Sequence, residues 1–120
     1  MSDINVKRTK TVFVAIVGNE EEGEKPFLRY EIDEKNRVIK LIETYTPPKL
    51  RGRGIAEKLV DEAVKFAKEN ELKIEPICSY AIYYFIKHSE KRDLLVDWMK
   101  NKNEEELKKI FDEAIQRERK

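Results

Sequence analysis

A basic, glycine-bearing turn is the part of this sequence best suited to chemistry. It runs from Thr46 to Ala56, between a β-branched segment and an amphipathic helix pattern. Backbone N–H groups at a helix start lack partners and carry partial positive charge, so they attract anions. Gly52 and Gly54 let a ligand approach the backbone without a Cβ in the way. The basic side chains of the turn are Lys49, Arg51 and Arg53. This combination predicts a phosphate-binding site.

The same turn has a simpler interpretation. Arginines also make an ordinary strand-to-helix turn soluble, and the spacing Arg51-x-x-Gly54-x-Ala56 arises by accident in roughly one chain in ten of this length. The position of the turn favours phosphate binding, because a strand precedes it, a proline pair at 47–48 ends that strand, and a long helix follows. A helix start placed after a strand is a common site for phosphate groups.

Composition narrows the function classes. The 120 residues suit one domain, residues 1–120, with no room for a second full core. Basic and acidic residues number 25 and 24, so no overall field attracts nucleic acid or an acidic membrane. One cysteine and one histidine cannot build a disulfide or a zinc cage, so no metal site is expected. With no signal peptide and no membrane span in the pattern, we expect a cytoplasmic protein.

The order of the expected elements is strand-rich at first and helical later. Short β-branched segments bounded by turn residues predict three antiparallel strands, at 11–17, 26–33 and 37–45. A helix is expected over 52–70 and a fourth strand over 72–78. Because a strand–helix–strand unit crosses over right-handedly, the fourth strand should run parallel to the third. Ser79 is expected to cap a helix that ends near His88, and a short helix is expected at 94–99. The predicted fold class is α+β.

The last segment, 103–120, predicts an added amphipathic helix. Asn103 is a good N-cap, acidic residues follow it, and basic residues end the segment. The apolar residues of this segment form one stripe, which consists of Leu107, Ile110, Phe111, Ala114 and Ile115. Such a stripe packs either on the domain's own core or against another chain. A homodimer through this helix is therefore one of the two interpretations.

Three local segments resemble a known family. They are 43–48 (ETYTPP), 50–56 (LRGRGIA) and 76–80 (PICSY), and their order and spacing are similar to the small, minimal branch of the GNAT N-acetyltransferases. The spacing Arg51-x-x-Gly54-x-Ala56 fits the family's signature for the pyrophosphate of acetyl-CoA. The resemblance covers most of the chain. Residues 1–41 resemble the family only in that they are rich in strands, and the helix from Asn103 lies outside the resemblance.

The resemblance implies a GNAT-like fold and acetyl-CoA as cosubstrate, lying in a cleft where the third and fourth strands splay apart. The pantetheine arm would pair with backbone groups at Thr44 and Tyr45. The pyrophosphate would lie on the turn, and the residues implied there are Arg51, Gly52, Arg53, Gly54, Ile55 and Ala56. The chemistry of the residues agrees with this placement, because the carboxyl ends of neighbouring parallel strands form a natural crevice.

The resemblance also suggests catalytic candidates. Some members of this branch carry a histidine where this chain has Glu43, which is either a base for the acceptor's proton or an exposed strand carboxylate. Cys78, at the end of the fourth strand, is either a carrier of the acetyl group, a cleft-lining residue or a small buried side chain. Tyr80 and Tyr84 lie where the family often places a tyrosine that protonates the departing thiolate, although core packing also explains them.

The leading hypothesis is an acetyltransferase that moves an acetyl group from acetyl-CoA to a primary amine of a protein or small molecule. Direct attack in a ternary complex is favoured over a covalent cysteine intermediate. A second hypothesis is a CoA-binding regulatory or interaction module with little turnover, because so short a chain has few elements to form an acceptor pocket. A third is a phosphate- or nucleic-acid-binding domain, which the balanced charge disfavours.

Overall fold

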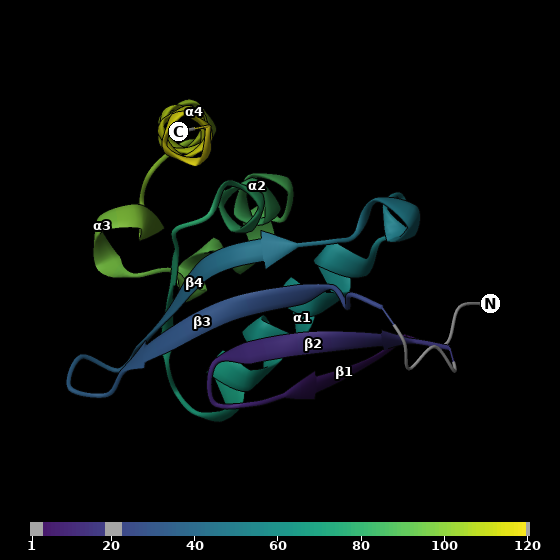
Figure 1. The fold of residues 1–120 in the computed structure, drawn as a ribbon. Helices are drawn as coiled ribbons and strands as arrows, with labels where there is room; N and C mark the ends of the chain where they lie inside the picture. Colours follow the sequence, from purple (N-terminus) through teal and green to yellow (C-terminus); the bar gives the residue numbers. More distant parts are fainter. Residues whose placement is uncertain (1–3, 19–22, 120) are drawn as a thin grey trace.

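A computed structural model describes residues 4–18 and 23–119 of the chain. Their centre is a five-stranded sheet in the order β1-β2-β3-β4-β5 (Figure 1). The strands are β1 (Ile4–Arg8), β2 (Val12–Val17), β3 (Phe27–Asp33), β4 (Val38–Tyr45) and β5 (Lys73–Pro76). The first four pair antiparallel and β5 pairs parallel to β4. The predicted α+β class, with a meander followed by a parallel crossover, is confirmed.

The helices follow the predicted order with adjusted ends. They are α1 (Ile55–Glu69), α2 (Ser79–Lys87), α3 (Asp97–Lys100) and α4 (Glu104–Glu118). The prediction began α1 three residues too early, because Gly52 and Gly54 both have positive φ angles, 81° and 74°, which a helix does not accept. Asn70 ends the helix as predicted, and its side-chain amide donates to the Phe66 carbonyl at 2.9 Å.

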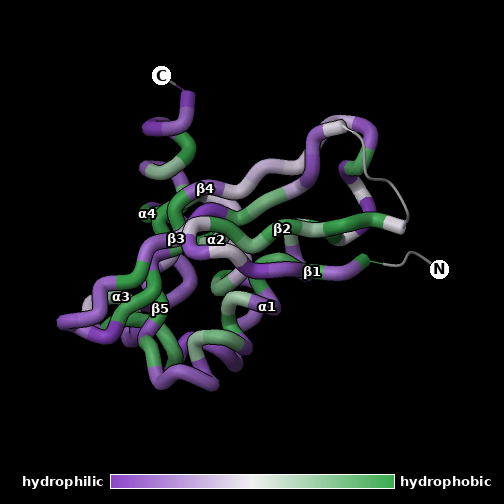
Figure 2. Tube along the Cα trace, turned by 60° about the horizontal axis from the view of Figure 1, so that its bottom comes forward, coloured by the Kyte–Doolittle hydropathy of each residue, from purple (hydrophilic) through white to green (hydrophobic). Residues whose placement is uncertain are grey.

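The prediction missed β1. This edge strand alternates only two apolar residues, Ile4 and Val6, with polar ones, so its strand signal is weak. Figure 2 shows the contrast between the hydrophilic β1 and the hydrophobic β2 beside it. β1 pairs antiparallel with β2, from Ile4 opposite Val17 to Arg8 opposite Phe13. This pairing, rather than the composition of β1, makes the segment a strand. Charged edge strands of this kind resist pairing with other chains.

One face of the sheet packs against α1. Alternate residues of β2, β3 and β4 point to this face, and α1 turns its apolar stripe towards them. Leu28, Ile39, Leu41 and Leu59 are fully buried there. Each such side chain contributes about 1.5–3 kcal/mol when buried. This core fixes the position of α1, and so it fixes where the Thr46–Ala56 turn lies.

A bulge in β4 shapes the cleft. On β3, Arg29 and Tyr30 are neighbours, but their partners on β4 are Glu43 and Leu41, so Ile42 is an extra residue in β4. A bulge bends its strand and increases the local twist. Beyond Leu41 the pairing of β4 with β5 ends, while its pairing with β3 continues to Tyr45. The bulge therefore lies where β4 leaves β5.

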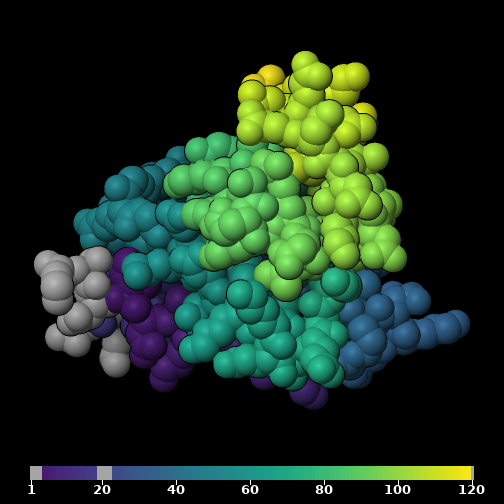
Figure 3. Space-filling view, turned by 180° about the vertical axis from the view of Figure 1, so that it is seen from behind, coloured from purple at the N-terminus to yellow at the C-terminus, as the bar shows by residue number. Residues whose placement is uncertain are grey.

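The C-terminal helix α4 packs on the outer side of α2, away from α1 (Figures 1 and 3). Asn103 caps it as predicted, in a capping box with Glu106 in which both hydrogen bonds are 2.9 Å. Leu107 and Ala114 of α4 are fully buried, and Phe111 lies against Tyr83 of α2 with ring centroids 6.3 Å apart. Packing on the chain's own core thus buries part of this stripe, while Ile110, Phe111 and Ile115 stay half-buried. A dimer contact through α4 stays a prediction.

Candidate active site

A cleft opens where β4 and β5 separate. The N–H groups of Ile77 and Cys78 both donate to the Leu41 carbonyl, at 2.8 and 3.1 Å, and these bonds end the contact between the two strands. Beyond them lies a cavity of about 490 Å³, which we call the strand cleft. It is lined by Arg29, Ile42, Glu43, Thr44, Cys78, Ser79, Tyr80 and Glu118. Three of the four catalytic candidates named from the sequence, Glu43, Cys78 and Tyr80, line this cleft, and Tyr84 does not.

A second cavity, of about 300 Å³, lies over the glycine turn, and we call it the turn pocket. It is lined by Thr46, Leu50, Arg51, Gly52, Gly54, Ile55, Ala56, Glu57, Tyr80 and Lys87. Gly54 is the N-cap of α1, and it provides no side-chain hydrogen bond to cap the helix start. A Cβ built on Gly52 or Gly54 would meet nothing within 4 Å. Their backbone therefore faces open space, with the first-turn N–H groups beside it.

The turn itself is held in place by local contacts. Pro48–Leu50 forms a short 3-10 helix whose Leu50 is buried, and Ile55 anchors the start of α1 in the core. The Arg51 Nε–H donates to the Thr46 carbonyl at 3.0 Å, which fixes the guanidinium at the rim of the turn pocket. Lys87 of α2 adds a second cation to the lining. Arg53 is exposed and is not among the lining residues.

Tyr80 lies in the first turn of α2 and lines both cavities, so it marks where they meet. Burial, assisted by the negative charge of Glu57, raises the pKa of Tyr80 to about 12. Its hydroxyl therefore keeps its proton at neutral pH. A hydroxyl in this state donates a hydrogen bond to whatever occupies the junction of the two cavities.

Cys78 is the N-cap of α2 and is 5% exposed. Its Sγ lies 3.1 Å from Thr44 Oγ1, which joins the ends of the two splayed strands across the cleft floor. Burial raises the pKa of the Cys78 thiol, and the charge of Glu118 acts in the same direction, against weaker opposing hydrogen bonds from Thr44 and from backbone. The thiol form therefore dominates at neutral pH, and this form is a poor nucleophile.

Glu43 lines the strand cleft together with Cys78 and Ser79. One of its carboxylate oxygens accepts a hydrogen bond from Arg29 Nε at 3.2 Å, and the two residues are register partners across β3 and β4. Both side chains are about half exposed, so the ion pair contributes little stability. The contact nevertheless orients the carboxylate along the wall of the cleft.

Glu118, near the end of α4, was not predicted as part of the site. Its carboxylate accepts hydrogen bonds from the backbone N–H of Ser79 at 2.8 Å and from Ser79 Oγ at 2.7 Å. The sequence signal for a Ser79 cap was misleading, since the N-cap is Cys78 and the Ser79 hydroxyl donates to Glu118 instead. The two residues are 39 positions apart, and no local pattern joins them.

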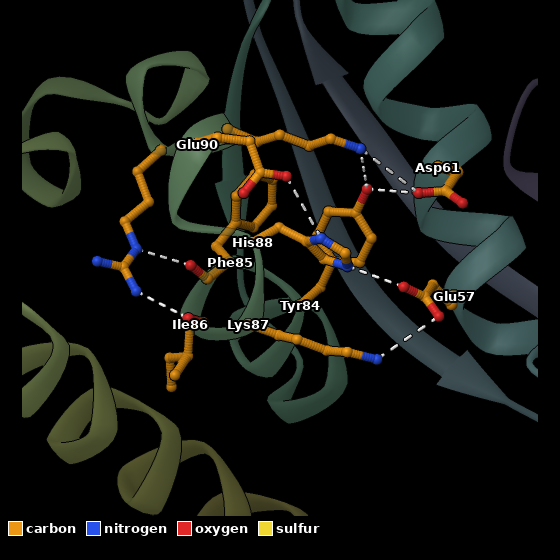
Figure 4. A network of polar contacts seen from close by, with 10 residues as sticks. Glu57, Asp61, Tyr84, Phe85, Ile86, Lys87, His88 and Glu90 are labelled. Atoms are coloured by element: carbon orange, nitrogen blue, oxygen red, sulfur yellow. Dashed lines mark hydrogen bonds and ion pairs between the residues drawn. The ribbon is translucent and has the colours of Figure 1, made fainter.

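The side chains of Tyr84 and Tyr45 line neither cavity, although Tyr45 lies in the chain between Thr44 of the strand cleft and Thr46 of the turn pocket. The Tyr84 hydroxyl donates to Asp61 at 2.5 Å and accepts from Lys91 at 2.8 Å, within a polar network that also joins His88 to Glu57 at 2.8 Å (Figure 4). Burial, followed by the hydrogen bond to Asp61, raises the pKa of Tyr84 well above its ordinary value. The Tyr45 ring packs near Phe27, with centroids 5.8 Å apart.

Among residues 4–18 and 23–119, no group of three or more His, Cys, Asp or Glu side chains is placed to hold a metal ion. No helix within the same ranges has the length and apolar character needed to cross a membrane.

Comparison with known proteins agrees with this arrangement. The family model of the GCN5-related N-acetyltransferases matches residues 13–94, which span β2 to the segment after α2. The chain is also similar to a GCN5-like protein of Staphylococcus aureus, solved by NMR and named as a candidate N-acetyltransferase. The two share 29% identity with a TM-score of 0.61, over 80% of this chain and 91% of that one. The chain therefore belongs to the GCN5-related N-acetyltransferase family, and it is an acetyltransferase.

Proposed function

We propose that the enzyme transfers acetyl from acetyl-CoA to a primary amine, by direct attack within a ternary complex. The observation that carries the proposal is the junction of two different cavities at Tyr80. The turn pocket offers backbone N–H groups and cations, which suit a pyrophosphate. The strand cleft offers an unpaired strand edge and polar side chains, which suit an extended arm and an acceptor.

The residues of both cavities fit acetyl-CoA. The open backbone at Gly52 and Gly54 and the uncapped start of α1 would hold the pyrophosphate, with Arg51 and Lys87 at the rim. Within the described part of the chain, the edge of β4 beyond Leu41 has no partner strand on the β5 side, so Thr44 and Tyr45 offer backbone groups to the pantetheine arm. Ile55 and Ala56 contribute their backbone, since the Ile55 side chain is buried.

When bound, acetyl-CoA supplies an activated acetyl group: the acceptor nitrogen bonds to the carbonyl carbon, the C–S bond breaks, and the products are an amide, the CoA thiol and one released proton. An ammonium cannot attack until it has lost a proton. Glu43, on the cleft wall, is the carboxylate that would accept this proton, directly or through water. Its contact with Arg29 holds it in place for that role.

Tyr80 would act on the leaving sulfur as a hydrogen-bond donor. A hydroxyl with a pKa of about 12 is a weaker acid than a thiol, whose usual pKa is about 8.5, so complete proton transfer from Tyr80 to the thiolate is uphill. A hydrogen bond to the developing negative charge stabilises the transition state without that transfer. Tyr80 rather than Tyr84 is proposed here, because the Tyr84 hydroxyl is bonded to Asp61 and Lys91 outside both cavities.

Direct attack is supported by the state of Cys78. A covalent route needs a thiolate, whereas burial holds this thiol protonated. Cys78 would instead close the floor of the cleft through its contact with Thr44.

Steady-state acetylation separates the enzyme from a CoA-binding module with little turnover. Purified protein is incubated with acetyl-CoA and a panel of small primary amines and lysine peptides, and acetylated products are detected by mass spectrometry. We expect amide products, formed at a rate that saturates with amine concentration. Tight acetyl-CoA binding without product from any amine would replace the transferase proposal with the binding-module alternative.

A further inference from the structure

The last turn of α4 forms part of the strand cleft, although α4 lies outside the family match, which ends at residue 94. Two contacts hold this turn against the beginning of α2. Glu118 accepts both hydrogen bonds from Ser79, and Arg117 Nη2 donates to the Ile77 carbonyl at 3.1 Å. The family's shared elements form the rest of the cleft, so α4 adds a wall that the matched region does not supply.

Glu118 brings to the cleft a negative charge that is not held in an ion pair by any residue of 4–18 or 23–119. The charged lining residues are Arg29, Glu43 and Glu118. Arg29 and Glu43 pair with each other, whereas Glu118 forms no ion pair with any residue of the described ranges. A carboxylate has about four acceptor positions, and Ser79 occupies two of them. The remaining positions are free to bind a donor in the cleft.

We propose that Glu118 is a specificity residue for the acceptor: it binds a second positive charge on an amine that carries two, such as a short diamine. This inference rests on the proposed function and names the acceptor class of the same site. The helix α4 completes the acceptor side of the cleft, and the shared core of the family provides the cosubstrate side.

The charge that Glu118 binds must differ from the reacting amine. The reacting nitrogen gives up its positive charge before it attacks, so an ionic contact to it weakens on the way to the transition state. A second ammonium keeps its charge throughout and stays bound. Substrates with one amine and a neutral group in place of the second ammonium therefore lose this contact.

The hydrogen bonds to Ser79 also allow a purely structural role, since a carboxylate at a helix start stabilises that helix. Glu118→Gln separates the two roles, because an amide oxygen still accepts a hydrogen bond from Ser79 but carries no charge. Glu113→Gln is the matched control, an exposed residue of α4 that does not line the cleft. Thermal melting of both variants checks that the fold is kept.

Direct binding is measured first, without turnover. Titration of the protein with 1,4-diaminobutane by calorimetry should show binding that weakens at least about tenfold in Glu118→Gln, the size of one charged hydrogen bond, and stays unchanged in Glu113→Gln. The isosteric probe 4-aminobutan-1-ol should bind more weakly to the wild type and equally to both variants. Equal binding of the diamine to wild type and Glu118→Gln would overturn the proposal.

Rates give the second readout. The ratio of kcat/KM for 1,4-diaminobutane to that for 4-aminobutan-1-ol should fall about tenfold in Glu118→Gln, mainly through KM. If both amines are acetylated and Glu118→Gln leaves the ratio of kcat/KM unchanged, Glu118 is only a helix cap. The proposed function would then stay intact. Failure of the wild type to acetylate any amine, despite acetyl-CoA binding, would instead overturn the proposed function and this inference with it.

Discussion

The turn pocket and the strand cleft are built in different ways. Most of the turn pocket comes from one continuous stretch, Thr46 to Glu57, with Tyr80 and Lys87 added from α2. The strand cleft collects residues from β3, β4, the start of α2 and the end of α4, from Arg29 to Glu118. The first cavity depends on local backbone conformation, and the second depends on how distant elements pack.

This difference has a functional consequence. A phosphate group is recognised by backbone N–H groups and positive φ angles, which a short sequence encodes. An acceptor is recognised by side chains that several elements bring together, so the preferred acceptor changes when an element such as α4 is added. We therefore expect substitutions in the turn to affect the cosubstrate and substitutions in the cleft to affect turnover and acceptor choice.

The largest effect is expected at the turn. Gly54→Trp should weaken acetyl-CoA binding by at least about 100-fold, because the indole would fill the space over the start of α1 and block several charge-assisted hydrogen bonds. Gly23→Trp is the matched control, with a positive φ of 91° and equally open surroundings away from both cavities. Calorimetry compares the two. Normal affinity in Gly54→Trp would show that the phosphate lies elsewhere.

The next effect is expected at the junction of the cavities. Tyr80→Phe should lower kcat about 100-fold with little change in acetyl-CoA affinity, since it removes a hydrogen bond to the leaving sulfur. Tyr84→Phe should instead lower the unfolding free energy by about 1 kcal/mol through the loss of its bonds to Asp61 and Lys91. Steady-state kinetics and thermal melting test both. If Tyr84→Phe proved the slower enzyme, the assignment of Tyr80 would be wrong.

A smaller effect is expected for the cleft cysteine. Cys78→Ala should lower kcat less than about tenfold, because the thiol serves packing and the contact with Thr44. A covalent nucleophile would cost on the order of 10⁴-fold or more when removed. Single-turnover kinetics, together with mass spectrometry of acid-quenched protein, checks for an acetylated intermediate. Its detection on Cys78 would contradict direct attack.

The smallest effect is a pH dependence at the turn pocket. The hydrogen bond from His88, and then the charge of Lys87, lower the pKa of Glu57. A carboxylate with a lowered pKa stabilises the fold above its unfolded pKa of about 4.3, and this contribution is lost as pH falls through the folded pKa. Compared with Glu57→Gln, the wild type should therefore lose its advantage in melting temperature between about pH 5 and pH 3. A difference that grows with acidification would reverse the sign of this argument.

The parts of the molecule that could be predicted from the sequence are those that short patterns encode. The glycine turn, α1 and the Asn103 cap of α4 follow from local spacing, and all three occur, with α1 beginning three residues later than predicted. β1 was missed because it has only two apolar residues and depends on pairing with β2. The pattern of residues within β1 does not show that the segment pairs with β2.

The strand cleft shows the same limit. Glu43, Cys78 and Tyr80 were placed by their positions at strand and helix ends, and they lie together. The sequence pattern places Tyr84 on the same helical face as Tyr80, but packing against α1 directs the Tyr84 hydroxyl to Asp61. Glu118 could not be found, since its link to Ser79 depends on the docking of α4 against α2.

NMR titration shows whether a single acetyl-CoA molecule occupies both cavities. Backbone amide spectra are recorded by NMR during titration with acetyl-CoA and, separately, with 3′-phospho-ADP, the part of the molecule that ends at the pyrophosphate. We predict that acetyl-CoA shifts the amides of Gly54 to Glu57 together with those of Thr44 and Cys78, while 3′-phospho-ADP shifts the turn alone. Shifts from acetyl-CoA that leave either the turn or the strand cleft unaffected would contradict the account.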